Sequence, residues 1–393
     1  MHNKSKEIFI RYAFLLFLRR IRKRASQALK IAPKAYQPKV VGKRGIENSA
    51  NVPIASYICR PDTSFETMKT IQFREAVCEA MSEEMRRDEN IFLMGEEVAE
   101  YNGAYKASKG MLDEFGAKRV IDTPIAELGF AGISTGAAMN GLRPIVEFMT
   151  FNFSMVAIDQ IINNAAKMKQ MSGGQINVPI VFRGPTASAG QLAATHSQAF
   201  ESWYANCPGL KVIVPSNPYD CKGLLKSAIR DNDPVIFMES EQMYGDKGEV
   251  PEGEYTLPIG VADIKRKGTD VTIVSFGKII KVAYEAADKL AEEGISCEII
   301  DLRTVRPIDY DTVIESVKKT NRLVCLEEAW PLGSISTEIT YKVQQEAFDF
   351  LDAPIKRITT TDTPAPYSPT LLEAFLPQVG QVIEAVKSVM YVK

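Results

Sequence analysis

The chain has 393 residues, of which 45% are hydrophobic and 24% are charged, and its formal net charge is −2. This length suggests two or three domains, and the apolar content is sufficient for sizeable cores. The charge is unevenly distributed, because residues 1–60 hold 14 Lys/Arg and two acids, which leaves 33 Lys/Arg against 47 Asp/Glu, a net of −14, in the remainder. Such an acidic body argues against nucleic acid as the main partner.

Residues 1–67 form a basic leader. Its apolar run at 8–18 is interrupted by Arg11 and followed by a basic cluster at 19–24. The run is shorter than the ~20 residues of a membrane-spanning helix, and the order of its parts is the reverse of a secretory signal. We therefore expect no membrane span. The leader is either a transit peptide, a segment that touches a membrane surface, or a disordered stretch outside the fold, with Met68 as an alternative start.

The cysteines bear on the compartment. None of the six forms a CxxC pair, and no histidine lies at zinc-finger spacing. This pattern is typical of free thiols in a reducing compartment. We expect a bacterial cytoplasmic protein, or a mitochondrial-matrix protein if the leader is a transit peptide.

From residue 70 onward the hydrophobic pattern alternates between helix and strand. Helices are predicted at 73–87, 129–139, 154–171, 220–230, 279–293, 310–319 and 334–348, and strands at 91–94, 119–121, 144–148, 179–182, 210–214, 235–238, 270–275, 297–302 and 322–326. Residues 240–262 are rich in Gly, Pro and Glu without clear periodicity, which is typical of a linker. The fold class is therefore α/β, with two doubly wound, mostly parallel-sheet domains at 68–245 and 266–393 joined by a linker at 246–265.

Glu127 is the first candidate for chemistry. It follows a predicted strand and a Pro turn, and it opens a helix of small residues in which Gly132 and Gly136 lie four apart. Backbone amides at a helix N-terminus favour an anion by ~0.3–1 kcal/mol. Taken alone, the residue is as readily explained as a glutamate that serves only the helix dipole. Small residues at this spacing let another helix or a ligand approach closely.

Three other features follow predicted strands. Glu96 and Glu97 stand after the strand at 91–94, where they suit either a ligand site or a solvated turn. An aromatic cluster at 147–153 either lines a ligand site or belongs to the hydrophobic core. His196, one of two histidines, lies in a Gly/Ala/Ser-rich loop at 184–198 that is ill suited to packing a core. Its unperturbed pKa suits proton transfer near neutral pH, although an incidental surface histidine explains it too.

Several motifs are absent from the sequence. It has no phosphate-binding P-loop, no GxSxG, no HExxH and no GxGxxG that opens a strand–turn–helix unit. It also lacks the Gly-Asp-Gly loop, followed by Asn about 25 residues on, that holds the metal and diphosphate in thiamine enzymes. The stretch at 245–248 is only superficially similar, since no helix follows it.

Taken together, five strings resemble the beta subunits of the thiamine-dependent 2-oxoacid dehydrogenases, and among these the pyruvate enzymes most closely. The strings are LMGEEV (93–98), DTPIAELGFAG (122–132), EFMTFNF (147–153), ANCPGLKV (205–212) and KSAIRD (226–231). The resemblance covers about 70–393 and leaves the leader out. It implies a pyrimidine-binding domain, then a transketolase C-terminal-like domain, in an α2β2 heterotetramer whose alpha subunit supplies the diphosphate and magnesium site.

The resemblance also implies roles for particular residues. Glu127 matches the glutamate that hydrogen-bonds the pyrimidine of thiamine diphosphate and favours its imino tautomer, and His196 matches a histidine that handles protons during acyl transfer to lipoyl. Glu96, Ile125, Met149 and Phe153 match residues that line the pyrimidine. Ile180, Ala228, Asp231 and Asp233 match a structural potassium site, in which some relatives have Asn at the position of Asp233.

The resemblance implies decarboxylation of pyruvate and transfer of the acetyl group to the lipoyl domain of a dihydrolipoyl acetyltransferase core, in acetyl-CoA synthesis. Two alternatives remain open. One is the beta subunit of an acetoin or branched-chain 2-oxoacid dehydrogenase, although the string at 148–153 resembles the pyruvate enzymes more. The other is a non-catalytic assembly subunit, against which Glu127, His196 and the aromatic cluster argue.

Overall fold

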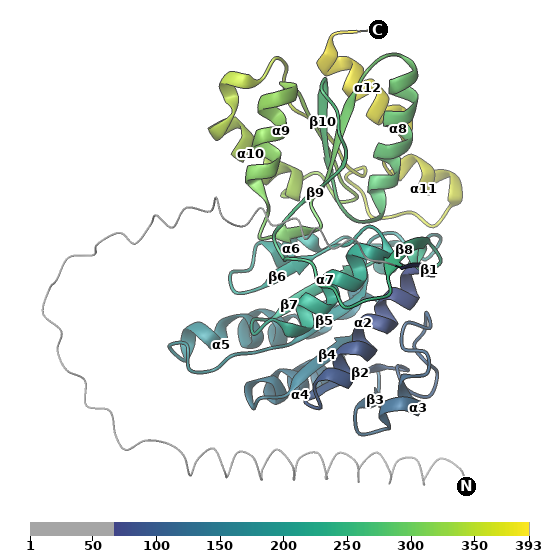
Figure 1. Cartoon of the computed structure of the whole chain (residues 1–393), viewed down its shortest axis with the longest axis vertical. Coiled ribbons are helices and arrows are strands. Elements are labelled where there is room, and N and C mark those ends of the chain that lie inside the picture. Colours follow the sequence, from purple (N-terminus) through teal and green to yellow (C-terminus); the bar gives the residue numbers. More distant parts are fainter. Residues whose placement is uncertain (1–66, 393) are drawn as a thin grey trace, which may run out of the picture. The chain divides into compact units, whose positions relative to one another are not determined.

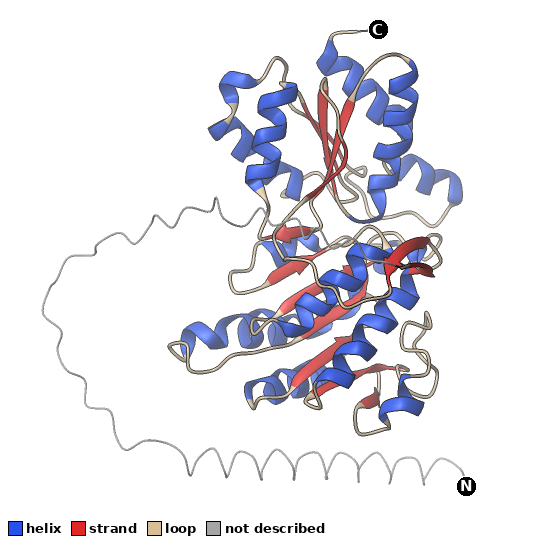
Figure 2. Ribbon diagram, in the orientation of Figure 1, coloured by secondary structure: helices blue, strands red, loops and turns tan. Residues whose placement is uncertain are grey.

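Buried apolar strands form two mostly parallel sheets in the computed structural model, which describes residues 67–392 (Figures 1 and 2). The first sheet has the order β12-β6-β7-β5-β4-β2-β3, and only β12 runs antiparallel to its neighbour. The second has the order β14-β13-β10-β11-β9, in which only β9 is antiparallel. Strands buried on both faces are typical of parallel sheets covered by helices, so the predicted α/β class is confirmed.

The elements divide into an N-terminal block, residues 67–251, and a C-terminal block, residues 263–392. The N-terminal block contains β1 (Met68–Gln72), α2 (Phe73–Arg87), β2 (Ile91–Glu96), α3 (Met111–Phe115), β3 (Val120–Thr123), α4 (Glu127–Met139), β4 (Arg143–Glu147), α5 (Ala166–Met171), β5 (Val181–Pro185), α6 (Glu201–Ala205), β6 (Lys211–Ile213), α7 (Pro218–Arg230), β7 (Val235–Glu239) and β8 (Lys247–Pro251). The C-terminal block contains β9 (Asp263–Arg266), β10 (Val271–Ser275), α8 (Ile280–Glu292), β11 (Cys297–Asp301), β12 (Thr304–Arg306), α9 (Tyr310–Thr320), β13 (Leu323–Leu326), α10 (Ile335–Glu346), β14 (Lys356–Ile358), α11 (Pro369–Phe375) and α12 (Val379–Met390).

Helices α2 and α7 pack against each other in the N-terminal block. The α7 helix begins with an Asn217 side chain that accepts the Asp220 backbone N–H at 2.9 Å, a common N-cap arrangement. The buried Lys222 ammonium lies 2.8 Å from a Glu79 carboxylate oxygen and 2.7 Å from one of Glu83, both on α2. Because a buried ammonium is costly without such partners, these ion pairs help to specify how the two helices meet.

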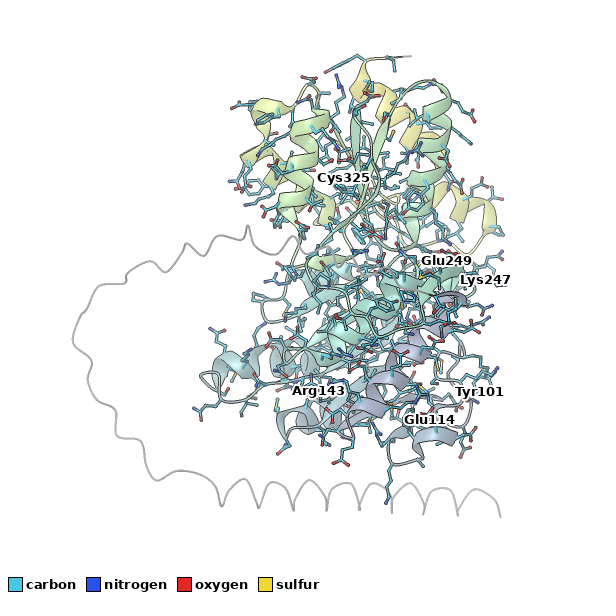
Figure 3. The ribbon with its side chains drawn as sticks, in the orientation of Figure 1. Tyr101, Glu114, Arg143, Lys247, Glu249 and Cys325 are labelled. Atoms are coloured by element: carbon cyan, nitrogen blue, oxygen red, sulfur yellow. The ribbon has the colours of Figure 1, made fainter. Side chains whose placement is uncertain are left out.

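In the C-terminal block, helices lie on both faces of the sheet. Figure 1 shows α8 and α12 on one side of β10 and α9 and α10 on the other. The core comprises apolar side chains of β10, β11, β13, α8 and α12. Cys325 lies in this sheet on β13 (Figure 3), and it is one of five described cysteines, all of them free thiols; Cys59 lies outside the described residues.

The prediction of a single helix at 154–171 is wrong in its detail. It is a 3₁₀ helix, η2 (Phe151–Ala157), then a π-helical turn, η3 (Gln160–Ala165), and only then α5. The Ser154 hydroxyl bonds to the Phe151 carbonyl and the Tyr204 hydroxyl, at 2.6 Å each, and such side-chain bonds compete with regular α-helix. The segment packs against α4, where a Cβ on Gly132 would lie 3.2 Å from Gln160. The small residues of α4 therefore permit a close approach, as expected.

The range expected to be a linker, 246–265, contains regular structure. Strand β8 pairs antiparallel with β1, with Met68 opposite Pro251 and Gln72 opposite Lys247, and β9 begins at Asp263. Sequence patterns did not reveal β8, because its charged and small residues alternate little. Its partner is also about 180 positions away along the chain.

Candidate active site

The expected site residues come from the carboxyl ends of four neighbouring parallel strands, β5, β4, β2 and β3. Glu96 ends β2, Glu127 begins the helix after β3, and Met149 and Phe153 follow β4. His196 lies in the 3₁₀ turn η4 (Ala194–His196) after β5. Ligands of open α/β sheets bind outside this edge. The sheet order therefore places residues 100 positions apart in sequence along one edge.

Glu96 and Glu127 form a buried acidic pair, with 5% and 6% of their surfaces exposed. Burial, which is the largest cause, and the negative charge of Glu127 together raise the pKa of Glu96 to about 7. The Met149 backbone amide opposes this rise by donating to the Glu96 carboxylate. Glu96 is therefore about half protonated at neutral pH. Its Oε1 atom is buried and has no hydrogen-bond partner in residues 67–392.

The local fold assigns different roles to these two carboxyl groups. Strand β3 ends at Thr123, Pro124 turns the chain, and Glu127 is the first residue of α4. The positive end of the helix dipole favours negative charge at that position. Glu96 has no such helix end, and with a pKa of about 7 it is partly protonated near neutral pH. Two adjacent carboxyl groups in different environments are typical of an acid–base site.

Phe153 and His196 meet where the chain segments after β4 and β5 approach each other. Their ring centroids lie 5.0 Å apart, with the planes nearly perpendicular at 83°. The His196 Nδ1 atom lies 3.0 Å from the Thr195 hydroxyl. The Asn152 side-chain oxygen accepts the Gln198 backbone N–H at 2.9 Å, which links the two segments beside the rings. This edge-to-face contact orients the imidazole.

Ile125 is placed differently from the other expected residues. Its side chain is 80% exposed, although it stands two positions before the buried Glu127. Leu128 is 49% exposed on the same turn. Two large apolar side chains are therefore exposed near the edge of the candidate site.

Sequence reasoning missed a buried charge network beneath the site. The guanidinium of Arg183, on β5, donates two hydrogen bonds to the Glu239 carboxylate, at 2.6 and 2.5 Å, and a third to Glu147. The Tyr244 hydroxyl also donates to Glu239, at 2.7 Å. Arg183 is fully buried, and an arginine in a buried strand was the available signal. Its partners are apparent only when β4 and β7 are known to flank β5.

The four residues expected to bind potassium lie near one another. The Ile180 carbonyl accepts the Val235 amide at 2.9 Å, which connects it to the strand that follows Asp233. Ala228 belongs to the last turn of α7, and its carbonyl accepts the Asp231 amide at 3.3 Å. The structure therefore groups the expected set at the amino ends of β5 and β7.

Ammonium and guanidinium groups of the chain already occupy this region. Lys169 lies 2.5 Å from the Asp233 carboxylate, and Lys211 lies 2.5 Å from that of Asp231 and 3.3 Å from that of Asp233. Arg143, labelled in Figure 3, donates to the Asp231 carbonyl at 2.5 Å. These cations neutralise both carboxylates, so the donor set does not require a metal ion for charge balance. Within residues 67–392 no cluster of three or more His, Cys, Asp or Glu is suited to a metal.

Comparisons with known proteins agree with this architecture. Family models match the chain over residues 69–247, described as the transketolase pyrimidine-binding domain, and over 260–382, described as the transketolase C-terminal domain. A solved split-gene transketolase, an inactive beta4 tetramer, has a TM-score of 0.68 at 22% identity and matches 82% of this chain and 99% of its own, which shows the fold. Within the described residues, no helix is both long and apolar enough to cross a bilayer.

Curated relatives are more similar in sequence. The pyruvate dehydrogenase E1 component subunit beta of Rhizobium meliloti is 59% identical over 82% of this chain and 71% of its own length. The corresponding subunit of Rickettsia felis is 55% identical over 82% and 98%, and the mitochondrial subunit beta-2 of Oryza sativa is 54% identical over 82% and 87%. The chain therefore belongs to the family of pyruvate dehydrogenase E1 component beta subunits, built from transketolase-type pyrimidine-binding and C-terminal domains.

Proposed function

We propose that this chain is the beta subunit of a pyruvate dehydrogenase that decarboxylates pyruvate on thiamine diphosphate and transfers the acetyl group to a lipoyl domain. The observation that carries the proposal is the buried pair of Glu96 and Glu127 at the carboxyl edge of the first sheet. Its relatives at 54–59% identity carry the corresponding name.

Unpartnered polar atoms support a bound aminopyrimidine at this edge. Glu96 Oε1, Thr123 Oγ1 and Ser197 Oγ are buried and have no hydrogen-bond partner in residues 67–392. Buried polar groups are normally paired, so such atoms gathered near one edge suit a polar ligand. The donor and acceptor types fit a ring with ring nitrogens and an amino group. Glu96, Glu127, Met149 and Phe153 would hold that ring.

The residues of this chain would bind, orient and move protons. Thiamine diphosphate, when bound, supplies the electron sink that allows a 2-oxoacid to lose carbon dioxide. The Glu127 carboxylate would accept a hydrogen bond from the pyrimidine ring and hold a proton at that nitrogen. Glu96, whose pKa is raised to about 7, would place less negative charge beside the Glu127 carboxylate than an ordinary glutamate does. His196, held by Phe153, would exchange a proton with the acyl acceptor.

A second polypeptide is part of the proposal. The sequence lacks the Gly-Asp-Gly motif, and the exposed Ile125 and Leu128 at the site edge offer an apolar surface. We propose that an alpha subunit carries the diphosphate and magnesium site, covers this surface, and completes an α2β2 heterotetramer. A dihydrolipoyl acetyltransferase core would supply the lipoyl domain.

The potassium site and the compartment remain predictions. Lys169 and Lys211 balance the charges of Asp231 and Asp233, and comparing thermal stability in potassium and in choline salts tests whether the site also binds potassium. The leader lies outside the described residues. A bacterial cytoplasm and a mitochondrial matrix are therefore both retained, and an import assay with and without residues 1–67 separates them.

The test of the proposed function is Glu127→Gln in the enzyme reconstituted with its alpha subunit. We expect pyruvate turnover to fall by about 10²–10⁴-fold, the usual contribution of a positioned acid or base, with unchanged circular dichroism. Glu97→Gln, at an exposed carboxylate beside Glu96, is the matched control and should retain activity. Near wild-type turnover of the Glu127 variant would contradict the assignment. Profiling of acetoin and branched-chain 2-oxoacids against pyruvate decides the substrate.

A further inference from the structure

The loop that carries His196 has little regular structure of its own. Between β5 and α6 it contains one 3₁₀ turn, and Ala187 and Ala193 adopt positive φ angles of 61° and 64°. Alanine rarely adopts this conformation, and strained residues persist only when their surroundings hold them. The Ala187 amide donates to the Gln198 carbonyl at 2.9 Å, which closes the base of the loop.

Ser188 is the point at which the C-terminal block holds this loop. Its backbone amide donates to the Glu328 carboxylate at 2.7 Å, and its carbonyl accepts a hydrogen bond from the Lys278 ammonium. Ser188 is fully buried. Both polar groups of one peptide segment are thus bound by charged side chains, and charge-assisted hydrogen bonds are about twice as strong as neutral ones.

The two charged residues also pair with each other. Lys278 Nζ lies 3.0 Å from Glu328 Oε2, and it donates a further hydrogen bond to the Gln242 side chain at 2.9 Å. The ammonium thus donates hydrogen bonds to two acceptors, Ser188 and Gln242, and forms an ion pair with Glu328. Only 10% and 7% of the Lys278 and Glu328 side chains are exposed, so water competes weakly for these bonds.

The fold of the C-terminal block brings this pair together. Strands β10 and β13 are parallel neighbours, Lys278 lies in the 3₁₀ turn η6 (Gly277–Ile279) after β10, and Glu328 follows β13. The chain enters that turn through Gly277, whose φ is +61°. The carboxyl edge of the second sheet is therefore directed at the loop that follows β5 of the first.

A small cavity beneath the loop adjoins the pair. It has a volume of about 20 Å³, enough for a single water molecule, and its walls include Ala187, Glu201, Lys278 and Glu328. Burial, which is the largest cause, and the charge of Glu328 together raise the pKa of Glu201 to about 8. Glu201 is therefore mostly protonated at neutral pH, so the ion-pair partner of Lys278 is Glu328 and not Glu201.

One carboxylate connects this arrangement to His196. Burial raises the pKa of Glu241, while the Tyr105 hydroxyl, which donates to it at 3.0 Å, and the positive charges of Lys278 and His196 lower it. His196 and Lys278 are thus both close enough to the Glu241 carboxylate to act on it. Ser188 lies eight residues before His196 in the same loop.

We propose that Lys278 and Glu328 form a loop clamp, a pair of positioning residues that hold the 186–200 loop so that His196 meets the acyl acceptor. This inference rests on the proposed function, because it assigns His196 to transfer of the acetyl group. The clamp would act on that transfer more than on decarboxylation, which depends on Glu96 and Glu127.

The test compares Lys278→Met with Lys278→Arg and with Lys281→Met in the reconstituted heterotetramer. Lys281 also joins the two blocks, through an ion pair with Asp246, but it does not contact the loop, so it is a matched control. If Lys278→Met fails to fold, the double variant Lys278→Met with Glu328→Gln replaces it, because removing both charges of the pair leaves neither of them buried and unpaired. Three quantities are measured: hydrogen exchange in peptides spanning 186–200, kcat for acetylation of a lipoyl domain, and pyruvate decarboxylation with an artificial oxidant.

For Lys278→Met we expect exchange at 186–200 to accelerate at least tenfold and lipoyl acetylation to fall at least tenfold, with decarboxylation within about threefold of wild type. Lys278→Arg should recover most of both losses, and Lys281→Met should change neither. Two outcomes would overturn the clamp. One is unchanged hydrogen exchange at 186–200 in both the Lys278 variant and the double variant. The other is that the Lys278 and Lys281 variants lose lipoyl acetylation and decarboxylation to the same extent. If the wild-type heterotetramer does not act on pyruvate, the proposed function fails, while the exchange measurement still decides whether Lys278 holds the loop.

Discussion

Replacing Glu201 with Gln should remove a pH-dependent loss of stability. The Glu201 side chain is buried, and burial raises its pKa from 4.5 to about 8, with added repulsion from Glu328 and Glu327. Below pH 4.5 the carboxyl group is neutral in the folded and unfolded chain, so burial carries no ionic cost. Between pH 4.5 and 8 the unfolded chain loses the proton first, so the stability of the folded chain falls as pH rises.

The difference between the folded and unfolded pKa values sets the size of this effect. Linkage between an unfolded pKa of 4.5 and a folded pKa of about 8 predicts a loss of about 3.5 kcal/mol between pH 5 and pH 8 from this one group. With an unfolding entropy of ~2 cal/mol/K per residue over residues 67–392, the loss corresponds to a fall of about 5 °C in Tm. Gln has the same shape and no titration, so it should lack this slope.

Calorimetric scans at pH 5, 6, 7 and 8 test the prediction, with each protein in the same assembly state. We expect the Glu201→Gln variant to gain stability over wild type progressively as pH rises. Glu285→Gln, an exposed carboxylate on α8, is the control and should follow the wild-type curve. Parallel curves for wild type and the Glu201 variant would show that the buried carboxyl group does not retain its proton.

Two further predictions concern buried charge and backbone geometry. Arg183→Met leaves two buried carboxylates without their guanidinium, so it should lower the free energy of unfolding by ~3–5 kcal/mol, measured by urea denaturation. A loss below ~1 kcal/mol would mean that these groups are not paired in solution. Gly209→Ala should cost more than ~1 kcal/mol, because φ is +100° and the new Cβ would lie 2.0 Å from the Ala166 carbonyl oxygen. Gly116→Ala is the control: its φ is +73°, but no atom lies within 4 Å of the new Cβ, so it measures the cost of the backbone conformation alone. An equal loss of stability at both positions would refute the steric argument.

Hydrophobic periodicity predicted most of the strongly patterned elements, but it missed the amphipathic helix α12 and the weakly patterned elements. The helix predicted at 73–87 is α2, with the same bounds, because its apolar residues recur at helical spacing and are buried. The short α3 and α6 and the pairing of β1 with β8 were not predicted. Five-residue elements carry too few positions for a period, and a two-stranded ribbon depends on a distant partner.

The sequence by itself determined the α/β class, the family strings and the placement of Glu96, Glu127 and His196 after strands, because each depends on short-range pattern. Only the tertiary structure decided what those residues meet. The raised pKa of Glu96 beside Glu127 requires β2 and β3 to be neighbours in the sheet, and the partners of Arg183 require β4 and β7 to flank β5. The contact of Ser188 with Glu328 spans 140 positions and two sheets. Local sequence patterns encode which face of an element is buried. Charge and burial at a site depend instead on the order of the strands and on how the blocks pack, and a short stretch of sequence contains neither.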